Sequence, residues 1–599
     1  MVTPVLRPGR STVLRVEAGI HNAVPTMKQP QIASLAVISD RHTCALLDRD
    51  GTISWYCPGA FDQPALLSSL IDIDKGGFWD IEADGKKFEE RHFEGRSSVL
   101  YTTFSTDQGA FTLTDFMPLQ AAFKGICRMT SPAQVRLTSH ICLRADYGLA
   151  DAGLSVFSNH IIEIKSSKQW LHCSHKLILE GDNITCEIPA GEESWFALID
   201  SDQIDRETFD EALKTTLEKW EEIEAYVKYE GPFEKEVYSS LRALQQLVFE
   251  PTGGIIAAPT IALPEVIGGS RNYDYRYVWM RDAALITSSL VGLETNGEME
   301  RKFMSFVAGA KKKNRQSHVQ CFYGIDQTIR MDARELPLSG YQGSVPVMAG
   351  NTAAGQFQLD AESSILLACN AIYQKYDCKI EWDTVETIAD YICRNWERKD
   401  NGIWEEEQQQ HYTSSKAFAA RALEVMAAYQ PDQQLADRWL HNARLIREFI
   451  NKHCITSYGA YAVYAGSEDV DITCALFAPF EFDAPDSSLM QNTIAEIEAR
   501  YRDGDLYRRH LLEFDSAKEG VFLAASCWVA HYYALAGNLG KSKTILDAML
   551  GCANDLGYFS EEMDLKTGKM LGNFPQTFVH SSFICAVNGY KAAFAELPA

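Results

Sequence analysis

Long apolar runs and paired cysteines are both missing from this sequence. No stretch of about 18 consecutive apolar residues occurs, so a membrane-spanning helix is not predicted. The 15 cysteines form no CxxC pair and do not cluster with histidines, which argues against a zinc site and a disulfide framework. Reduced thiols in a cytoplasmic protein, with no metal site and no membrane partner, are the simpler expectation.

Basic charge is also scarce. Lys and Arg number 56 against 81 Asp and Glu, which gives a formal net charge of −25. Such a charge repels nucleic acid and anionic membrane surfaces, so neither is an expected partner. A neutral ligand fits this composition best. The oligomeric state is left open.

The chain of 599 residues is too long for one compact core. Residues 1–31 are predicted to form a loose N-terminal extension, and whether 1–26 belong to the native protein is left open. Alternating and β-branched segments such as "SVLYTTFSTDQGAFTLTDFMP" predict an antiparallel β-sandwich over 32–202. A charged stretch with helical periodicity predicts a linker helix within 203–232.

Helical periodicity dominates residues 233–599. Segments such as "QLDAESSILLACNAIYQKY", "AFAARALEVMAAYQ" and "VFLAASCWVAHYYALAG" recur, joined by long loops. About a dozen such segments predict helical hairpins packed as a ring or a solenoid. Because loops between rigid helices commonly carry function, we expect the functional residues to lie in these loops.

Two segments combine aromatic and charged side chains. "NYDYRYVWMRDA" contains Tyr275, Trp279 and the Arg281–Asp282 pair just before a predicted helix. Flat rings suit the C–H faces of a sugar, and charged groups suit its hydroxyls, although a packed aromatic cluster with a salt bridge would give the same pattern. "NGIWEEEQQQ" places Trp404 directly before three glutamates, which alone would also fit a solvated helix start.

A further carboxylate pair, in "YFSEEMD", follows an aromatic run near the C-terminus. Alone it would fit a capped loop. These segments occur in order with "HTCALLDRDGTISWYCPG", "PTGGIIAAPTIALPE", "GNTAAGQFQLD" and "GNFPQTFVH". In this ordered set the sequence resembles family 15 of the glycoside hydrolases, the glucoamylase, glucodextranase and trehalase group. The resemblance covers roughly residues 32–594.

The resemblance implies a fold and a set of roles. The fold is an N-terminal antiparallel β-sandwich followed by a C-terminal (α/α)6 toroid, with the active site in the central funnel of the toroid. Glu405 matches the general acid and Glu561 the general base. Arg281 and Asp282 match the pair that grips the terminal sugar, and the same pocket is lined by Tyr275, Trp279, Trp404 and Glu406. No metal and no cofactor are implied.

These roles predict an exo-acting, inverting α-glucosidase of the glucoamylase or glucodextranase type, which releases β-glucose from the non-reducing end of an α-glucoside. An α,α-trehalase of the same family is the alternative, and the linkage (α-1,4, α-1,6 or α,α-1,1) and the preferred chain length stay open. A disaccharide phosphorylase would use phosphate and need no general base. A non-catalytic regulatory or carbohydrate-binding toroid would not need both glutamates.

Two positions depart from the family pattern. Ala420 stands where many bacterial relatives have a tryptophan, and "EFDSAKEGVF" lacks the glycine-rich turn usual at 513–522. Both changes are expected to reshape the subsites beyond the first sugar.

Overall fold

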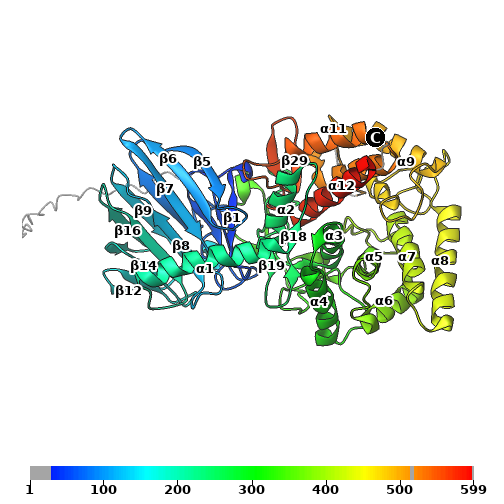
Figure 1. Cartoon of the computed structure of the whole chain (residues 1–599), viewed down its shortest axis with the longest axis horizontal. Helices are drawn as coiled ribbons and strands as arrows, with labels where there is room; N and C mark the ends of the chain where they lie inside the picture. Colours follow the sequence, from blue (N-terminus) through cyan, green and yellow to red (C-terminus); the bar gives the residue numbers. More distant parts are fainter. Residues whose placement is uncertain (1–27, 513–517, 596–599) are drawn as a thin grey trace, which may run out of the picture.

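A computed structural model describes residues 28–512 and 518–595. A β-sandwich and a lobe of helices lie side by side along the long axis of the molecule (Figure 1). The predicted N-terminal extension, 1–31, falls almost entirely outside the described residues, which begin at Lys28.

Two antiparallel sheets form the sandwich. The seven-stranded sheet has the order β1-β2-β3-β4-β9-β16-β15, and the eight-stranded sheet has the order β12-β13-β14-β17-β8-β7-β6-β5. The strands are β1 Ala36–Ser39, β2 Cys44–Leu47, β3 Ile53–Tyr56, β4 Phe78–Ala83, β5 Lys87–Phe93, β6 Leu100–Thr106, β7 Gly109–Phe116, β8 Gly125–Thr130, β9 Leu137–Cys142, β12 Leu154–Ser158, β13 Ile161–Ile164, β14 Gln169–Cys173, β15 Leu177–Glu180, β16 Asn183–Ile188 and β17 Ser194–Ile199. A short 3-10 helix, η1 (Ile32–Ser34), precedes them, and the two-residue strands β10 (Arg144–Ala145) and β11 (Ala150–Asp151) flank η2 (Asp146–Gly148).

Alternation along the strands explains the sandwich. In β16 the residues Ile184, Cys186 and Ile188 are buried while the residues between them are at least partly exposed, as the two-residue period of a strand requires. The inward faces interlock between the sheets, where Trp79 of β4 meets Phe196 of β17 edge to face at a centroid distance of 5.7 Å.

Helix α1 (Arg206–Ala225) lies within the predicted linker segment. It packs Phe209 and Ala212 on the outer face of the eight-stranded sheet, against Phe116 and Ile199. Figure 1 shows α1 running along the sandwich toward the helical lobe. The helix therefore covers a sheet face as well as connecting the two lobes. The predicted division at 202 and 232 stays a proposal.

The second lobe is a ring of helices in two layers. The inner layer contains α3 (Met280–Val291), α5 (Leu359–Tyr376), α7 (Thr413–Ala427), η5 (Ile472–Phe477), α10 (Leu523–Leu535) and α12 (Thr577–Ala595). The outer layer contains α2 (Glu234–Gln246), α4 (Glu298–Asn314), α6 (Trp382–Asn395), α8 (Gln433–His453), α9 (Ser488–Arg500) and α11 (Leu539–Leu550). The short 3-10 helix η5 takes the place of one inner helix, between α7 and α10.

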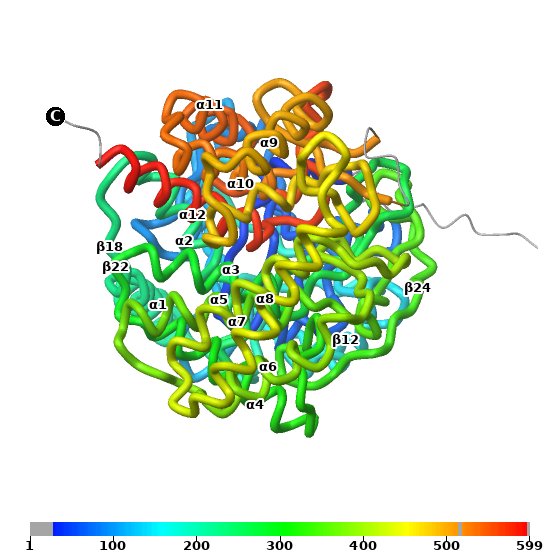
Figure 2. The backbone as a smooth tube through the Cα atoms, turned by 90° about the vertical axis from the view of Figure 1, so that its right-hand side faces the viewer, coloured from blue at the N-terminus to red at the C-terminus, as the bar shows by residue number. Residues whose placement is uncertain are grey.

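Sequence patterns explain the two layers. Outer helix α8 buries one stripe at three- and four-residue spacing, Ala436, Trp439, Ala443, Ile446 and Ile450. Inner helix α10 is buried on nearly all sides because its sequence, "LAASCWVAHYYAL", has no charged residue. Helix α12 packs against α3 and closes the ring, and Figure 2 shows it beside α2 and α3. The predicted fold class, a β-sandwich followed by a helical toroid, is confirmed.

Short strands join the loops of the ring. They are β18 Val227–Lys228, β19 Val248–Phe249, β20 Gly254–Ile255, β21 Val278–Trp279, β22 Glu294–Thr295, β23 Phe322–Tyr323, β24 Arg334–Leu336, β25 Val347–Ala349, β26 Arg502–Asp503, β27 Leu506–Tyr507, β28 Val521–Phe522, β29 Glu562–Asp564 and β30 Lys569–Leu571. Two more 3-10 helices, η3 (Tyr341–Gly343) and η4 (Thr352–Gly355), lie in the long loop before α5.

Sandwich and ring share one hydrophobic core. A single buried cluster runs from β1 through the sandwich into the inner helices. Hydrogen bonds cross the junction, where Trp55 Nε1 donates to Pro259 O at 2.8 Å and Gln246 Nε2 donates to Val37 O at 2.8 Å. The sandwich therefore supports the loop before α3, which carries several of the predicted site residues.

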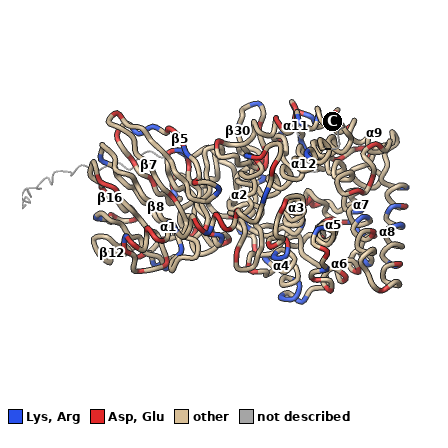
Figure 3. The backbone as a smooth tube through the Cα atoms, viewed as in Figure 1, with Lys and Arg blue, Asp and Glu red and all other residues tan. Residues whose placement is uncertain are grey.

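Several charges inside the protein are paired, while those on the surface are mixed. Buried ion pairs join Arg128 to Asp115 at 2.6 Å and Lys416 to Asp400 at 3.2 Å. Figure 3 shows acidic and basic residues interspersed over both lobes. Pairing is what allows these groups to be buried at acceptable cost.

Candidate active site

One cavity in the ring is lined by all eight residues that the sequence predicted for the site. Its volume is about 310 Å³, at the lower end of the range of ligand pockets. The eight residues are Tyr275, Trp279, Arg281, Asp282, Trp404, Glu405, Glu406 and Glu561. The structure therefore brings together three segments that lie far apart in the sequence.

The cavity lies where inner helices begin. Arg281 and Asp282 are in the first turn of α3, and Phe522 and Gln576 directly precede α10 and α12. Helix N-termini carry partial positive charge, which favours the carboxylates gathered here. The loops before the inner helices thus supply the walls of the site.

Arg281 is held by acidic and amide groups at the bottom of the cavity. Its Nε lies 3.2 Å from Asp282 Oδ1, and its Nη1 lies 3.2 Å from Gln358 Oε1 and 3.4 Å from Asp360 Oδ2. Burial raises the pKa of Asp282 to about 6 and that of Asp360 to about 6, in both cases against the opposing effect of Arg281. The guanidinium is fixed in direction, as binding a sugar hydroxyl would require.

Glu405 occupies a constrained position. Its backbone is left-handed, with φ 58°, a conformation that is unfavourable for a residue other than glycine and often marks a functional site. Asn401 supports the turn, since its Nδ2 donates to Glu406 O at 2.7 Å. The side chain of Glu405 is 23% exposed. The left-handed turn thus places Glu405 at the cavity, which it lines together with Trp404 and Glu406.

One oxygen of Glu405 is fully engaged. Oε1 accepts hydrogen bonds from Trp279 Nε1 at 2.7 Å and Gln358 Nε2 at 3.3 Å, and it lies 3.6 Å from Arg281 Nη2. No donor within the described part of the chain bonds to Oε2. A proton carried by this carboxyl group would therefore reside on Oε2.

Glu561 is more deeply buried, at 2% exposure. Its Oε1 accepts a hydrogen bond from the Tyr275 hydroxyl at 2.9 Å. Burial raises the pKa of Glu561 to about 8; the Glu265 carboxylate adds to the rise, and Arg509 and the Tyr275 hydroxyl oppose it. Gly572 passes so close that a Cβ there would lie 2.5 Å from Glu561 Oε2, which explains the glycine in "GNFPQTFVH".

An aromatic pair connects the two candidate catalytic groups. Tyr275 bonds to Glu561, Trp279 bonds to Glu405, and the two rings meet edge to face at a centroid distance of 5.4 Å. Since one short segment holds both carboxylates, their relative placement depends on how the aromatic residues pack. This link is the main structural support for treating them as a pair.

Trp404 and Glu406 fix the wall next to Glu405. Trp404 Nε1 donates to both carboxylate oxygens of buried Asp471 at 3.1 Å, and its ring stacks on Trp528 at 5.9 Å. Glu406 Oε1 accepts the backbone N–H of Leu512 at 2.6 Å. Part of Glu406 is therefore used to tie the loop before α10 to the loop before α7.

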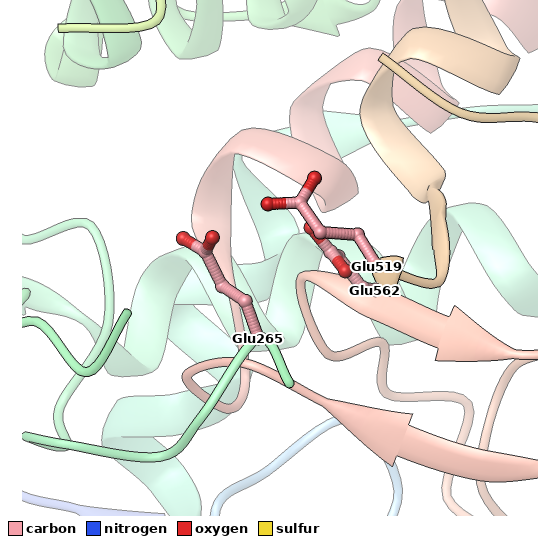
Figure 4. Close-up of side chains that lie close together, drawn as sticks. All are labelled: Glu265, Glu519 and Glu562. Atoms are coloured by element: carbon pink, nitrogen blue, oxygen red, sulfur yellow. The ribbon is translucent and has the colours of Figure 1, made fainter. Parts of the chain in front are cut away.

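Sequence inspection did not identify an ionic cluster beside Glu561. Figure 4 shows three glutamates close together, Glu265, Glu519 and Glu562, with ligand oxygens within 4.8 Å of one another. Arg509 lies 2.6, 3.0 and 3.4 Å from them respectively, and Arg271 Nε lies 2.5 Å from Glu265. A guanidinium thus already contacts all three carboxylates, and we assign no metal ion to the cluster.

The cluster is electrostatically coupled to the candidate base. Burial raises the pKa of Glu519 and, more strongly, of Glu562. At Glu265 burial acts in the same direction, but Arg509 and Arg271 outweigh it and lower the pKa. Glu265 therefore stays ionised and repels a negative charge on Glu561. The signal for Glu265 was present, because this residue ends the quoted segment "PTGGIIAAPTIALPE", and Arg271 directly precedes "NYDYRYVWMRDA".

The two departures from the family pattern lie in different places. Ala420 is fully buried in α7 and is not among the residues that line the cavity. The expected effect of this position on the subsites is therefore not a direct contact. "EFDSA", 513–517, lies outside the described residues, while Phe522 lines the cavity at the other end of the segment.

Known proteins are similar to this chain over most of its length. Trehalase 2 of Sulfolobus acidocaldarius is 28% identical over 588 residues, covering 92% of this chain and 98% of that protein. The trehalase of Thermoplasma acidophilum is 29% identical over 579 residues (92% and 99%), and that of Mycobacterium tuberculosis is 26% identical over 610 residues (93% and 89%). The relatives thus span both lobes.

A solved structure shares the fold. The crystal structure of a bacterial glucoamylase complexed with acarbose superposes with a TM-score of 0.69 at 14% identity, covering 94% of this chain and 95% of that one. Within residues 28–512 and 518–595, no helix has the length and apolar character needed to cross a membrane.

A sequence model covering most of the ring decides the family. It is described as glycosyl hydrolases family 15, and it matches residues 231–541 and 539–588. These matches take in every candidate site residue. The chain therefore belongs to glycosyl hydrolases family 15 and is a glycoside hydrolase.

Proposed function

We propose that this glucosidase is an inverting trehalase, in which Glu405 is the general acid and Glu561 the general base. The observation that carries the proposal is the shared cavity, in which Tyr275 and Trp279 hold the two carboxylates as a pair. Inverting glycosidases need one carboxyl group to protonate the leaving oxygen and another to activate water on the opposite face of the sugar.

Glu405 suits the acid role. With Oε1 bound to Trp279 and Gln358, the proton is carried on Oε2, which can donate it to the glycosidic oxygen as the bond breaks. Arg281, 3.6 Å from Oε1, then stabilises the carboxylate that forms. The same guanidinium and Asp282 are placed to bind hydroxyls of the sugar whose bond is cleaved.

Glu561 suits the base role only when it is ionised. With a pKa of about 8 in the ligand-free site, roughly one tenth of the molecules carry the carboxylate at pH 7. Arg509 and the Tyr275 hydroxyl favour the ionised form, while burial and Glu265 oppose it. We therefore expect kcat/KM to rise with pH until this group is ionised.

Trehalose is favoured over longer α-glucans. The relatives named trehalase align over nearly the whole chain, which supports the trehalase alternative better than the glucoamylase-like activity first expected. Besides Arg281, several other polar side chains line the cavity, among them Glu265, Arg271 and Arg509. A second glucose, rich in hydroxyls, suits such a wall whichever linkage joins it to the first.

The test compares substrates and product stereochemistry. We expect faster glucose release from trehalose than from maltose, isomaltose or maltooligosaccharides. Inversion at one carbon of trehalose yields one β-glucose and one α-glucose, so proton NMR before mutarotation should show the two anomers in equal amounts. Only α-glucose would mean retention and would remove the base role from Glu561.

Other outcomes would select the alternatives. Faster glucose release from maltooligosaccharides than from trehalose would indicate an activity of the glucoamylase type instead. Formation of glucose 1-phosphate, dependent on added phosphate, would identify a phosphorylase. The Glu561→Gln variant serves as the control, because a phosphorylase has no need of a general base, whereas the proposed hydrolase should lose activity.

A further inference from the structure

A second cavity of about 350 Å³ lies at the junction of the sandwich, helix α1 and the ring. Its walls come from the loop 40–42, the segment 118–124, the C-terminal half of α1, and the start of α4. It has no lining residue in common with the catalytic cavity. Nothing in the proposed reaction uses it.

Two buried polar side chains in its wall each have a polar atom without a hydrogen-bond partner. Asp40 is 3% exposed and Arg41 is 8% exposed. Among the described residues, Asp40 Oδ2 and Arg41 Nε have no hydrogen-bond partner, and Arg41 has no ion pair within 4.0 Å. Burial accordingly raises the pKa of Asp40 and lowers the pKa of Arg41. Groups buried in this way are normally satisfied by a partner.

The backbone holds Arg41 in place at some cost. Its φ is 62°, in the left-handed region. Arg41 N donates to Ser39 Oγ at 3.0 Å, and Arg41 O accepts from Glu250 N at 2.9 Å. Asp40 Oδ1 accepts the backbone N–H groups of His42 and Thr43 at 2.9 Å. These bonds thus fix the backbone of Arg41 and the carboxyl group of Asp40.

Most other charges in the wall already have partners. Lys302 Nζ lies 3.0 Å from Glu298 and 3.7 Å from Glu250, and Lys219 Nζ lies 2.8 Å from Glu222. Within the part of the chain that the structure describes, Arg41 and Lys124 are the lining lysine and arginine residues without a carboxylate within 4.0 Å. Arg41 therefore has no directly paired carboxylate, although Glu250 and Glu298 act on it from a greater distance, and it lies beside Asp40, whose pKa is raised by burial.

The rest of the wall is partly apolar, with Leu119, Phe123, Ile223 and Leu290. Four lining glutamates, at positions 222, 250, 298 and 300, disfavour a doubly charged anion. A planar carboxylate matches a guanidinium with two parallel hydrogen bonds. We propose that this cavity binds a small monocarboxylate with an apolar body, whose carboxylate pairs with Arg41 while Lys124 adds a second positive charge.

Such a ligand would contact the sandwich, α1 and the ring together, so binding should stabilise the whole chain. The probe is benzoate, with sodium chloride of equal ionic strength as the reference. We expect the Tm of the full chain to rise by about 2 °C at a hundredfold excess over Kd. Arg41→Gln should abolish the rise. Arg136→Gln, an exposed arginine that pairs with exposed Glu187, is the matched control and should keep it.

Several outcomes would overturn the proposal. They are no rise with benzoate, an equal rise in the Arg41→Gln variant, or a larger rise with inorganic phosphate than with benzoate. If Arg41→Gln does not fold, Lys124→Gln at the exposed edge replaces it. We then expect the half-saturating benzoate concentration to increase several-fold. An unchanged half-saturating concentration would contradict the proposal. Because Tm is measured without substrate, the result is independent of the trehalase proposal.

Discussion

Replacing Glu561 by glutamine should abolish hydrolysis and yet stabilise the protein. Burial raises the pKa of this carboxyl group from 4.5 to about 8 in the folded chain. Below pH 4.5 the folded and unfolded chains both hold the proton, so the group has no effect on stability. Between pH 4.5 and 8 only the folded chain holds it, and the free energy of unfolding decreases as pH rises. Above pH 8 the carboxylate of Glu561 is ionised in the folded chain as well, and the free energy of unfolding is reduced by the full cost of burying that charge.

The magnitude follows from the pKa separation. At about 1.4 kcal/mol for each pH unit, the cost reaches roughly 5 kcal/mol as an upper limit. An unfolding entropy of about 2 cal/mol/K per residue gives roughly 1.2 kcal/mol/K for a chain of 599 residues. Glu561→Gln cannot ionise and escapes this cost. Its Tm should therefore exceed that of the wild type by about 4 °C at pH 8.5 and by nearly nothing at pH 4.5.

Differential scanning calorimetry of both proteins from pH 4.5 to 8.5 measures this difference. Tyr275→Phe is the matched control, since it removes a hydrogen bond that favours the ionised form and leaves the carboxyl group in place. Its Tm should fall with pH at least as steeply as that of the wild type. A Tm difference between Glu561→Gln and wild type that stays constant over this range would refute the reasoning.

Three further predictions concern activity. Glu405→Gln should slow trehalose hydrolysis by at least ~10²–10⁴-fold. It should slow hydrolysis of α-glucosyl fluoride much less, because fluoride leaves without protonation. Initial rates on both substrates measure this, and equal losses of rate would contradict the acid role of Glu405. Arg281→Ala should lower kcat/KM by the equivalent of ~2–4 kcal/mol, since Asp282 and Asp360 lose the cation that they contact. An unchanged kcat/KM would contradict the assignment of Arg281 to sugar binding. Glu265→Gln removes a negative charge that raises the pKa of Glu561. The acidic limb of the plot of kcat/KM against pH should therefore move to lower pH. A shift to higher pH would show that Glu265 does not raise the pKa of Glu561.

Local segments explain how far sequence reasoning reached. The aromatic and charged residues of "NYDYRYVWMRDA" and "NGIWEEE" each lie within one short segment, so a short window contains the signal, and the structure brings them into one cavity. The two-residue and helical periods likewise indicated the sandwich and the ring, because burial of one face determines both patterns.

Residues whose role depends on distant partners were not predicted. Arg509 contacts Glu265, 244 positions away, and this contact has no sequence signature. Gln358 and Asp360 lay in a quoted segment, but their contacts with Arg281 depend on how α3 and α5 meet. Glu406 was predicted to line the pocket, and its bond to Leu512 N could be found only from the fold.

The common core of sandwich and ring makes this enzyme one unit of folding. Trp55 and Val37 are bonded to the ring, and their neighbours belong to the same buried cluster as the inner helices. A fragment starting near residue 233 would keep every candidate catalytic side chain but would expose an apolar face that water penalises. We therefore expect such a fragment to aggregate rather than to work as a minimal enzyme, so the catalytic ring is not a module that can be transplanted alone.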